Sequence, residues 1–176
     1  MSATPRRPRL TVLTGQAAAS AEWTWFCGHC AAPSPRGEAP FPSARVCPSC
    51  ALGLLLETPA DAVPGSRDAF LVIDSLLLVQ AMSATAESLL GVTEDLAVNR
   101  HVTDLLETAD AEGRSEMRFA SAVAQAASGD ESQTHVFVRP WNTFGVRMRA
   151  RISPCGPPRA ALLVLERPAR LRSLNR

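Results

Sequence analysis

The sequence predicts an α+β protein with an antiparallel sheet, preceded by a small cysteine-rich module. Two observations support this fold class. Four cysteines stand in two Cys-x-x-Cys pairs near the start of the chain, and apolar strands and helices follow in the order strand, strand, helices, three strands. We expect an organisation in five parts: a flexible arm over 1–21, the cysteine module over 22–57, a linker over 58–66, the α+β domain over 67–168 and a basic tail over 169–176.

The composition is that of a globular chain. It has 176 residues, a net charge of +1 and 46% hydrophobic residues. This length allows one ordinary core and an accessory module, and the balanced charge does not indicate a nucleic-acid or membrane partner. The apolar run at residues 10–13 is too short for a signal peptide, and charged and polar residues interrupt the run at 69–82. We therefore expect a cytoplasmic protein without a membrane partner.

The cysteine spacing predicts a structural metal site. Cys27 and Cys30 form the first pair, Cys47 and Cys50 form the second, and sixteen residues separate the pairs. This separation is typical of a four-thiolate zinc site, in which each pair forms a knuckle whose backbone amides turn toward the sulfurs. Four thiolates leave no open coordination position, so the ion is expected to build structure and not to catalyse. We expect one zinc ion per chain.

Two other uses of the cysteines stay open: a disulfide or redox dithiol, and an iron site, because tetrahedral four-sulfur geometry suits either metal. Disulfides are rare in a reducing cytosol, which favours a metal. His29 lies between two ligands and is expected to be exposed and not coordinating. The second pair reads Cys-Pro-x-Cys, so the module resembles a zinc ribbon, although Ala51 follows it where ribbons usually carry glycine.

The elements of the α+β domain follow from local patterns. An apolar helical turn is expected directly after Cys50, before the Pro- and Gly-rich linker. Ser83 is the expected N-cap of a short helix that Gly91 ends. The predicted strands are 69–75, 76–82, 134–141, 145–153 and 159–167, and the predicted helices are 83–92, 99–107 and 112–129.

The fourth predicted strand alternates apolar and basic residues, as a sheet with one buried and one wet face requires. The apolar set is Val146, Met148, Ala150 and Ile152, and the basic set is Arg147, Arg149 and Arg151. With Arg139 these arginines form a row that we expect to be solvated or to face a dimer partner, with an acidic or phosphate partner as the alternative. Cys155 is expected to be a passive turn residue.

The opening DAFLVID, the helix SATAESLLG and the phrase NRHVTDLLE, in this order of elements, resemble a PAS domain over about residues 66–168. The resemblance implies a five-stranded antiparallel sheet with helices over one face, in a sensor or interaction module that often encloses a small-molecule pocket and commonly dimerises. Two features depart from the family pattern. Ser83 stands where asparagine is frequent, and the usual turn glycine between the first two strands is missing.

The resemblance also bears on cofactors. A flavin domain of the LOV type would carry a reactive cysteine in the stretch that here reads VNRHVTDLL, and a haem sensor would usually carry a histidine on the long helix. Neither is present, so no flavin or haem is expected, and structural roles are expected for His101 and His135. The alanine-rich residues 120–127 are expected to pack close to the sheet, with a ligand pocket as the alternative.

Together these patterns predict a non-catalytic signalling or regulatory protein, because no nucleophile elbow, phosphate-binding loop or His-Glu metal motif is found in the sequence. The sensor or interaction domain would act on a protein partner, and a homodimer or a small-molecule ligand is compatible with it. One alternative is a redox or electron-transfer protein with iron or releasable zinc. A second is a transcriptional regulator that contacts nucleic acid through the ribbon.

Overall fold

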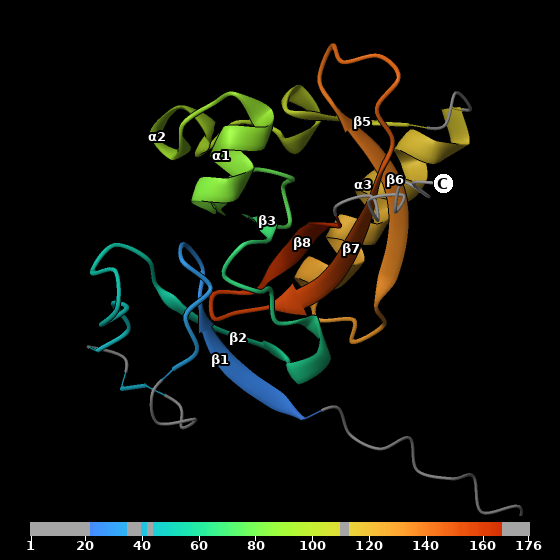
Figure 1. Ribbon diagram of the computed structural model, residues 1–176. Helices are drawn as coiled ribbons and strands as arrows, with labels where there is room; N and C mark the ends of the chain where they lie inside the picture. The colour runs from blue at the N-terminus through green and yellow to red at the C-terminus, as the bar shows by residue number, and fades with distance from the viewer. Residues whose placement is uncertain (1–21, 35–39, 42–43, 110–112, 167–176) are drawn as a thin grey trace, which may run out of the picture.

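The computed structural model describes residues 22–34, 40–41, 44–109 and 113–166, so the predicted arm and basic tail lie outside the described residues. A two-stranded sheet lies against a larger antiparallel sheet (Figure 1). The strands are β1 (Trp23–Cys27), β2 (Leu55–Pro59), β3 (Ala69–Ile73), β4 (Val79–Met82), β5 (Leu106–Thr108), β6 (Thr134–Pro140), β7 (Met148–Cys155) and β8 (Ala160–Glu166). The helices are α1 (Ala84–Leu90), α2 (Glu94–Ala97) and α3 (Gly113–Ser128), with 3-10 turns η1 (Ala60–Ala62) and η2 (Val102–Asp104).

The larger sheet has the order β4-β3-β8-β7-β6-β5 within the described chain. The five predicted strands all form, and their antiparallel pairing confirms the predicted α+β class. The sixth strand, β5, lies at the edge next to β6. It corrects the predicted helix at 99–107, which is only the turn η2 followed by β5. His101 bridges Leu78, and Leu106–Thr108 pair with β6, so strand partners use the backbone groups that a helix would need.

The helical turn predicted after Cys50 is also wrong, because this segment enters β2 and pairs with β1. Its side chains alternate between two environments. Leu55 packs with Trp25 beside the cysteines, whereas Leu56 packs with Phe26 toward the larger sheet. A strand satisfies both faces at once, which a single helical turn cannot do. β2 continues to Pro59, two residues past the expected end of the module at residue 57.

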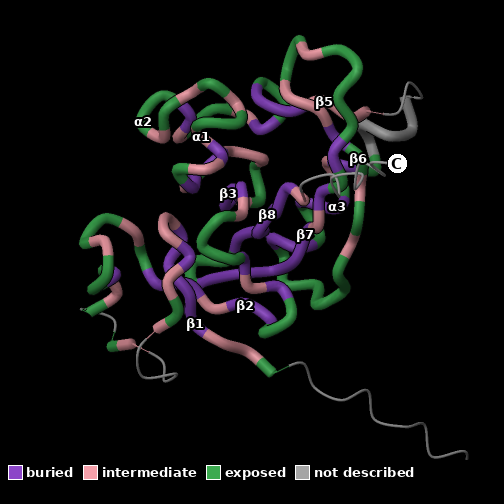
Figure 2. Tube along the Cα trace, in the orientation of Figure 1, coloured by how far each residue is buried: buried purple, intermediate pink, exposed green. Residues whose placement is uncertain are grey.

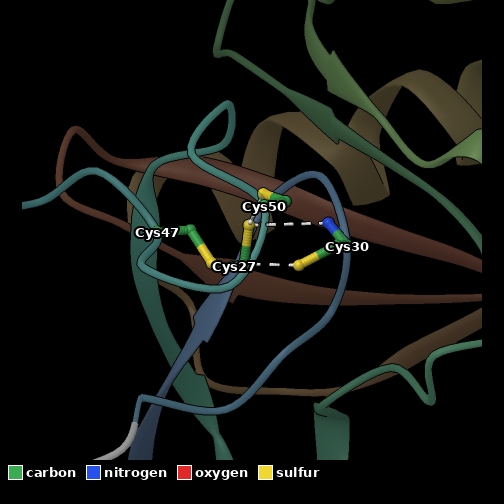
Figure 3. Close-up of side chains that lie close together, drawn as sticks. All are labelled: Cys27, Cys30, Cys47 and Cys50. Carbon is green, nitrogen blue, oxygen red and sulfur yellow. Dashed lines mark hydrogen bonds between the residues drawn. The ribbon is translucent and has the colours of Figure 1, made fainter.

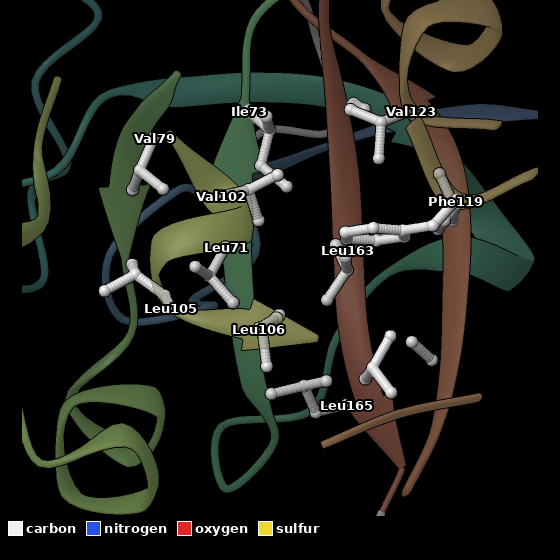
Figure 4. Close-up of a cluster of buried hydrophobic side chains, with 14 of the residues drawn as sticks. Leu71, Ile73, Val79, Val102, Leu105, Leu106, Phe119, Val123, Leu163 and Leu165 are labelled. Atoms are coloured by element: carbon white, nitrogen blue, oxygen red, sulfur yellow. The ribbon is translucent and has the colours of Figure 1, made fainter. Parts of the chain in front are cut away.

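Helices cover one face of the larger sheet, which we call the inner face. Phe119 and Val123 of α3 are fully buried against Leu71 and Leu163 of the central strands (Figure 4). This agrees with the expected close packing of the alanine-rich helix. The caps of α1 also form as predicted: the hydroxyl of Ser83 accepts the Ala86 N–H at 3.2 Å, and Gly91 is left-handed with φ 67°.

The opposite or outer face is partly covered by the cysteine module. Phe26 and Leu56 pack onto outward side chains of β3 and β8, namely Phe70, Val72, Leu162 and Val164. Figure 2 shows buried residues both in the small sheet and in β7 and β8, against which it lies. Thr58 Oγ1 donates a hydrogen bond of 2.8 Å to the carbonyl of Pro154, which joins the two sheets inside the protein. The outer face therefore has a buried half and an open half.

The predicted alternation in β7 holds only in the open half. Met148, Ala150 and Ile152 are buried, as expected, but Val146 precedes the strand and is exposed. From Ile152 to Cys155 every residue is buried, because the module covers the second face there. Among the described helices, none is long and apolar enough to cross a membrane.

Candidate metal centre

The fold brings the four predicted ligands together. Cys27 ends β1 and Cys30 lies in the turn after it, while Cys47 and Cys50 lie in the matching turn before β2 (Figure 3). All four sulfurs lie within 4.8 Å of one another. The sulfurs of Cys27 and Cys50 are 3.7 Å apart, and those of Cys30 and Cys47 are 3.8 Å apart.

These sulfur–sulfur separations fit an ion with tetrahedral coordination. Sulfurs about 2.3 Å from a central zinc ion would be about 3.8 Å from one another. A disulfide would need about 2.05 Å, and the described cysteines are free thiols. The four sulfurs are therefore spaced so that they could ligate one ion, and a four-thiolate set suits zinc or iron.

The first knuckle is a tight turn organised around one sulfur. Cys27 Sγ accepts the backbone N–H groups of His29 and Cys30 at 3.4 and 3.5 Å. The turn closes where the Ala31 N–H donates to the Cys27 carbonyl at 3.0 Å, with Ala31 in the left-handed region at φ 60°. The amide dipoles stabilise negative charge on the sulfur, as a thiolate ligand requires.

The second knuckle repeats this geometry. Cys47 Sγ accepts the Ser49 N–H at 3.3 Å, and the Ala51 N–H donates to the Cys47 carbonyl at 2.9 Å. Ala51 is left-handed at φ 57°, a conformation that costs an L residue about 1–2 kcal/mol relative to glycine. The alanine that departs from the ribbon pattern thus adopts the conformation that favours glycine. Ala51 therefore differs from the ribbon pattern in sequence but keeps the left-handed backbone conformation that suits glycine.

Gly53 is a site residue that the sequence analysis missed. Its N–H donates to Cys50 Sγ at 3.5 Å. A Cβ atom at this position would lie 2.6 Å from the Cβ of His29 and closer still to Cys27 Sγ. Only glycine lets the segment after the second knuckle pass against the first. The signal in the sequence is a single glycine three residues after Cys50, which by itself suggests only a turn.

The protein environment shifts the pKa values of the thiols in different directions. Burial raises the pKa of Cys27 well above its ordinary value and also raises the pKa of Cys30. Burial raises the pKa of Cys50 too, but the N–H groups of Gly53 and Leu52 outweigh it and lower that pKa to about 6. A bound metal ion would oppose the raised pKa values of Cys27 and Cys30, and binding would release protons.

His29 is not exposed, which corrects the sequence prediction. Its side chain is 19% exposed, and Nδ1 lies 3.1 Å from Oε2 of Glu94 at the start of α2. The other carboxylate oxygen, Oε1, accepts the Met82 N–H at 2.9 Å. His29 thus connects the first knuckle to the α+β domain and lies outside the cysteine set. This contact joins residues 65 positions apart, so no local pattern could indicate it.

The other predicted residues lie away from the centre. His101 Nδ1 lies 2.6 Å from Thr103 Oγ1, and His135 Nε2 lies 4.0 Å from Glu166 Oε1. Burial, followed by the charge of Arg149, lowers the pKa of His135. Cys155 is the last residue of β7 and not a turn residue, and its burial under the module raises its pKa to about 12.

The predicted arginine row interacts within the chain. Arg139 Nη2 lies 2.6 Å from Glu107 Oε2, and Arg149 Nε lies 3.6 Å from Glu166 Oε2. Two further contacts complete the row: Arg147 lies 3.9 Å over the ring of Phe137, and Arg151 donates to the carbonyls of Asp61 and Ala62. Arg147 and Arg149 are exposed, as expected of a solvated row, and all four arginines also make contacts within the chain on the outer face.

The C-terminal part of the chain is similar to solved PAS domains. A PAS domain of a Colwellia psychrerythraea protein is 15% identical and aligns with 56% of this chain and 84% of that chain, with a TM-score of 0.44. The PAS domain of a Desulfitobacterium hafniense protein is 12% identical over 57% and 92%, with a TM-score of 0.43. That of nitrogen regulation protein NR(II) from Vibrio parahaemolyticus is 18% identical over 62% and 95%, with a TM-score of 0.41. No family model and no curated protein matches the chain.

Proposed function

We propose that this chain is a non-catalytic signalling protein in which a structural zinc ion builds an interaction module on a PAS-like sensor or interaction domain. Cys27, Cys30, Cys47 and Cys50 would hold the ion. The observation that carries the proposal is the convergence of four sulfurs at tetrahedral spacing, with amide donors in both knuckles. The ribbon-like spacing of the pairs favours zinc over iron.

A structural role is supported by what the site touches. The same two strands that carry and flank the cysteines also place Phe26 and Leu56 on the larger sheet. Burying a large apolar side chain stabilises a fold by roughly 1.5–3 kcal/mol, so an ion that fixes β1 and β2 also fixes the cover of the outer face. Four thiolates would occupy the whole coordination sphere and leave no position for a substrate.

We propose that the signal passes from this chain to a protein partner. The protein would act in the cytoplasm, which keeps the thiols reduced. The open half of the outer face, formed by β6 and β7, is the surface that would be available for a homodimer of the PAS-like domain. The arginines on this half already have acidic, aromatic or carbonyl partners. A contact with a nucleic-acid backbone therefore gains no support from them.

Metal content tests the proposal. The protein is purified without added metal, and its elemental composition is measured together with its visible spectrum. We expect one zinc ion per chain and no colour. A red protein that contains iron would move the assignment to electron transfer, and a protein with neither metal would contradict the metal-built module.

A further inference from the structure

A cleft of about 770 Å³ separates the cysteine module from the α+β domain on the outer face. Its first wall is the knuckle region, with His29, Leu52 and Leu54, and its second wall is β4 and α2, with Ala81 and Glu94. Its volume falls in the range of about 300–1,000 Å³ that is usual for ligand sites in proteins. The cleft lies on the opposite side of the sheet from the core that α3 covers.

The knuckle wall presents apolar side chains to solvent. Leu52 is 74% exposed and Leu54 is 49% exposed, and both line the cleft. The floor continues this apolar surface, because the lining residues Leu56, Val72 and Ala160 are buried and belong to the core under the module. Exposed leucines that continue into an apolar floor are typical of an interaction site.

The opposite wall is acidic, because Asp74, Glu94 and Asp95 line the cleft. The Glu94 carboxylate already contacts His29 and the Met82 N–H, and the Asp74 carboxylate accepts hydrogen bonds from its own turn and from Gln80. Within the described chain no hydrogen bond or salt bridge engages the carboxylate of Asp95, so Asp95 is the one available for a cation. Arg159 also lines it, but its guanidinium donates to the Ser128 carbonyl at 3.3 Å. The whole chain has a net charge of +1, so this acidity is local. An occupant that complements the cleft would combine apolar side chains with a positive charge.

We propose that this cleft binds a segment of a partner protein in which adjacent apolar side chains lie beside a lysine or arginine. The apolar side chains would cover Leu52 and Leu54, and the cation would face Asp95. This inference rests on the proposed function, because the metal site holds the knuckle wall. The Gly53 N–H donates to Cys50 Sγ at 3.5 Å, and the Leu54 carbonyl accepts the Gly28 N–H at 2.9 Å.

A matched pair of labelled peptides tests the proposal on the zinc-loaded, full-length protein. One peptide is Lys-Leu-Leu-Lys-Ala-Leu-Leu-Lys, and in the other glutamate replaces every lysine. By fluorescence anisotropy we expect the basic peptide to bind at least tenfold more tightly than the acidic one. Leu52→Ser should weaken binding at least fivefold, whereas Leu76→Ser should not change it, since Leu76 is equally exposed, at 72%, but lies outside the cleft.

Three results would overturn the proposal: equal binding of the two peptides, binding of neither, or equal weakening by Leu52→Ser and Leu76→Ser. Zinc is measured on the same sample, which separates this inference from the proposed function. A protein with one zinc ion that binds neither peptide overturns the cleft assignment and leaves the metal-built module intact. Binding that survives removal of the zinc with a chelator contradicts the inference that the metal holds the knuckle wall in place.

Discussion

The two faces of the larger sheet are covered in different ways. The inner face is covered by helices that lie between the strands in the sequence, and α3 alone supplies Phe119 and Val123 to the core. The outer face is covered by β1 and β2. These strands precede the larger sheet in the sequence, and they meet at the four cysteines. The inner cover thus depends on apolar periodicity, and under the proposed function the outer cover depends on a bound metal ion as well as on apolar packing. Loss of the metal should therefore loosen the cover of the outer face far more than that of the inner face.

The largest expected effect comes from removing a ligand. Cys47→Ser replaces a buried cysteine sulfur with a hydroxyl, which is a much weaker zinc ligand. Binding of structural zinc to small domains contributes apparent free energies of about 10–16 kcal/mol, so we expect the module to lose both its metal and its fold. Zinc analysis and circular dichroism check this result. Cys155→Ser is the control, because Cys155 is buried but lies outside the cluster and should leave the zinc in place.

A pair of buried phenylalanines compares the two faces directly. Phe119→Ala opens a cavity under α3 and should lower the free energy of unfolding of the α+β domain by about 3–5 kcal/mol with zinc retained. Phe26→Ala opens a cavity of the same kind between the sheets and should loosen β1 and β2 alone. Chemical denaturation and hydrogen exchange distinguish the two variants. If both destabilise the whole chain equally, the faces are not independent.

A smaller effect is expected at Gly53. Gly53→Ala places a methyl group against His29 and the sulfur of Cys27, which should displace one knuckle from the other. Disturbing the groups that orient metal ligands typically reduces affinity by about 10–100-fold, and we expect a loss in this range. Competition with a chelator measures it. Gly65→Ala, in a loop away from the cysteines, should leave zinc affinity unchanged, and an equal loss in both variants would exclude the steric explanation.

The smallest effect is a gain in stability. Ala51→Gly relieves a left-handed alanine, which is worth about 1–2 kcal/mol, and glycine offsets about 0.5–1 kcal/mol of this through its greater freedom in the unfolded chain. We expect the module to be stabilised by up to about 1.5 kcal/mol. Thermal denaturation of the zinc-loaded protein tests this, and a lower melting temperature would show that the alanine is not strained.

The sequence predicted those features that local patterns determine. The five main strands follow from apolar runs and alternation, and the convergence of the four cysteines follows from spacing that knuckle geometry imposes. The segment that became β2 was misassigned because Leu54, Leu55 and Leu56 form a continuous apolar run, in which periodicity cannot separate a strand from a helical turn. The contact of His29 with Glu94 depends on how the module docks on the sheet. Docking is a tertiary property that no local pattern determines.

Hydrogen exchange of the full-length protein, before and after zinc is removed with a chelator, tests the central claim most directly. The claim is that a metal ion holds the cover of the outer face. We expect the amides of β1 and β2 to lose protection after chelation, while those of α3 and the central strands β3 and β8 keep most of theirs. Unchanged protection in β1 and β2, or an equal loss throughout the chain, would contradict this claim.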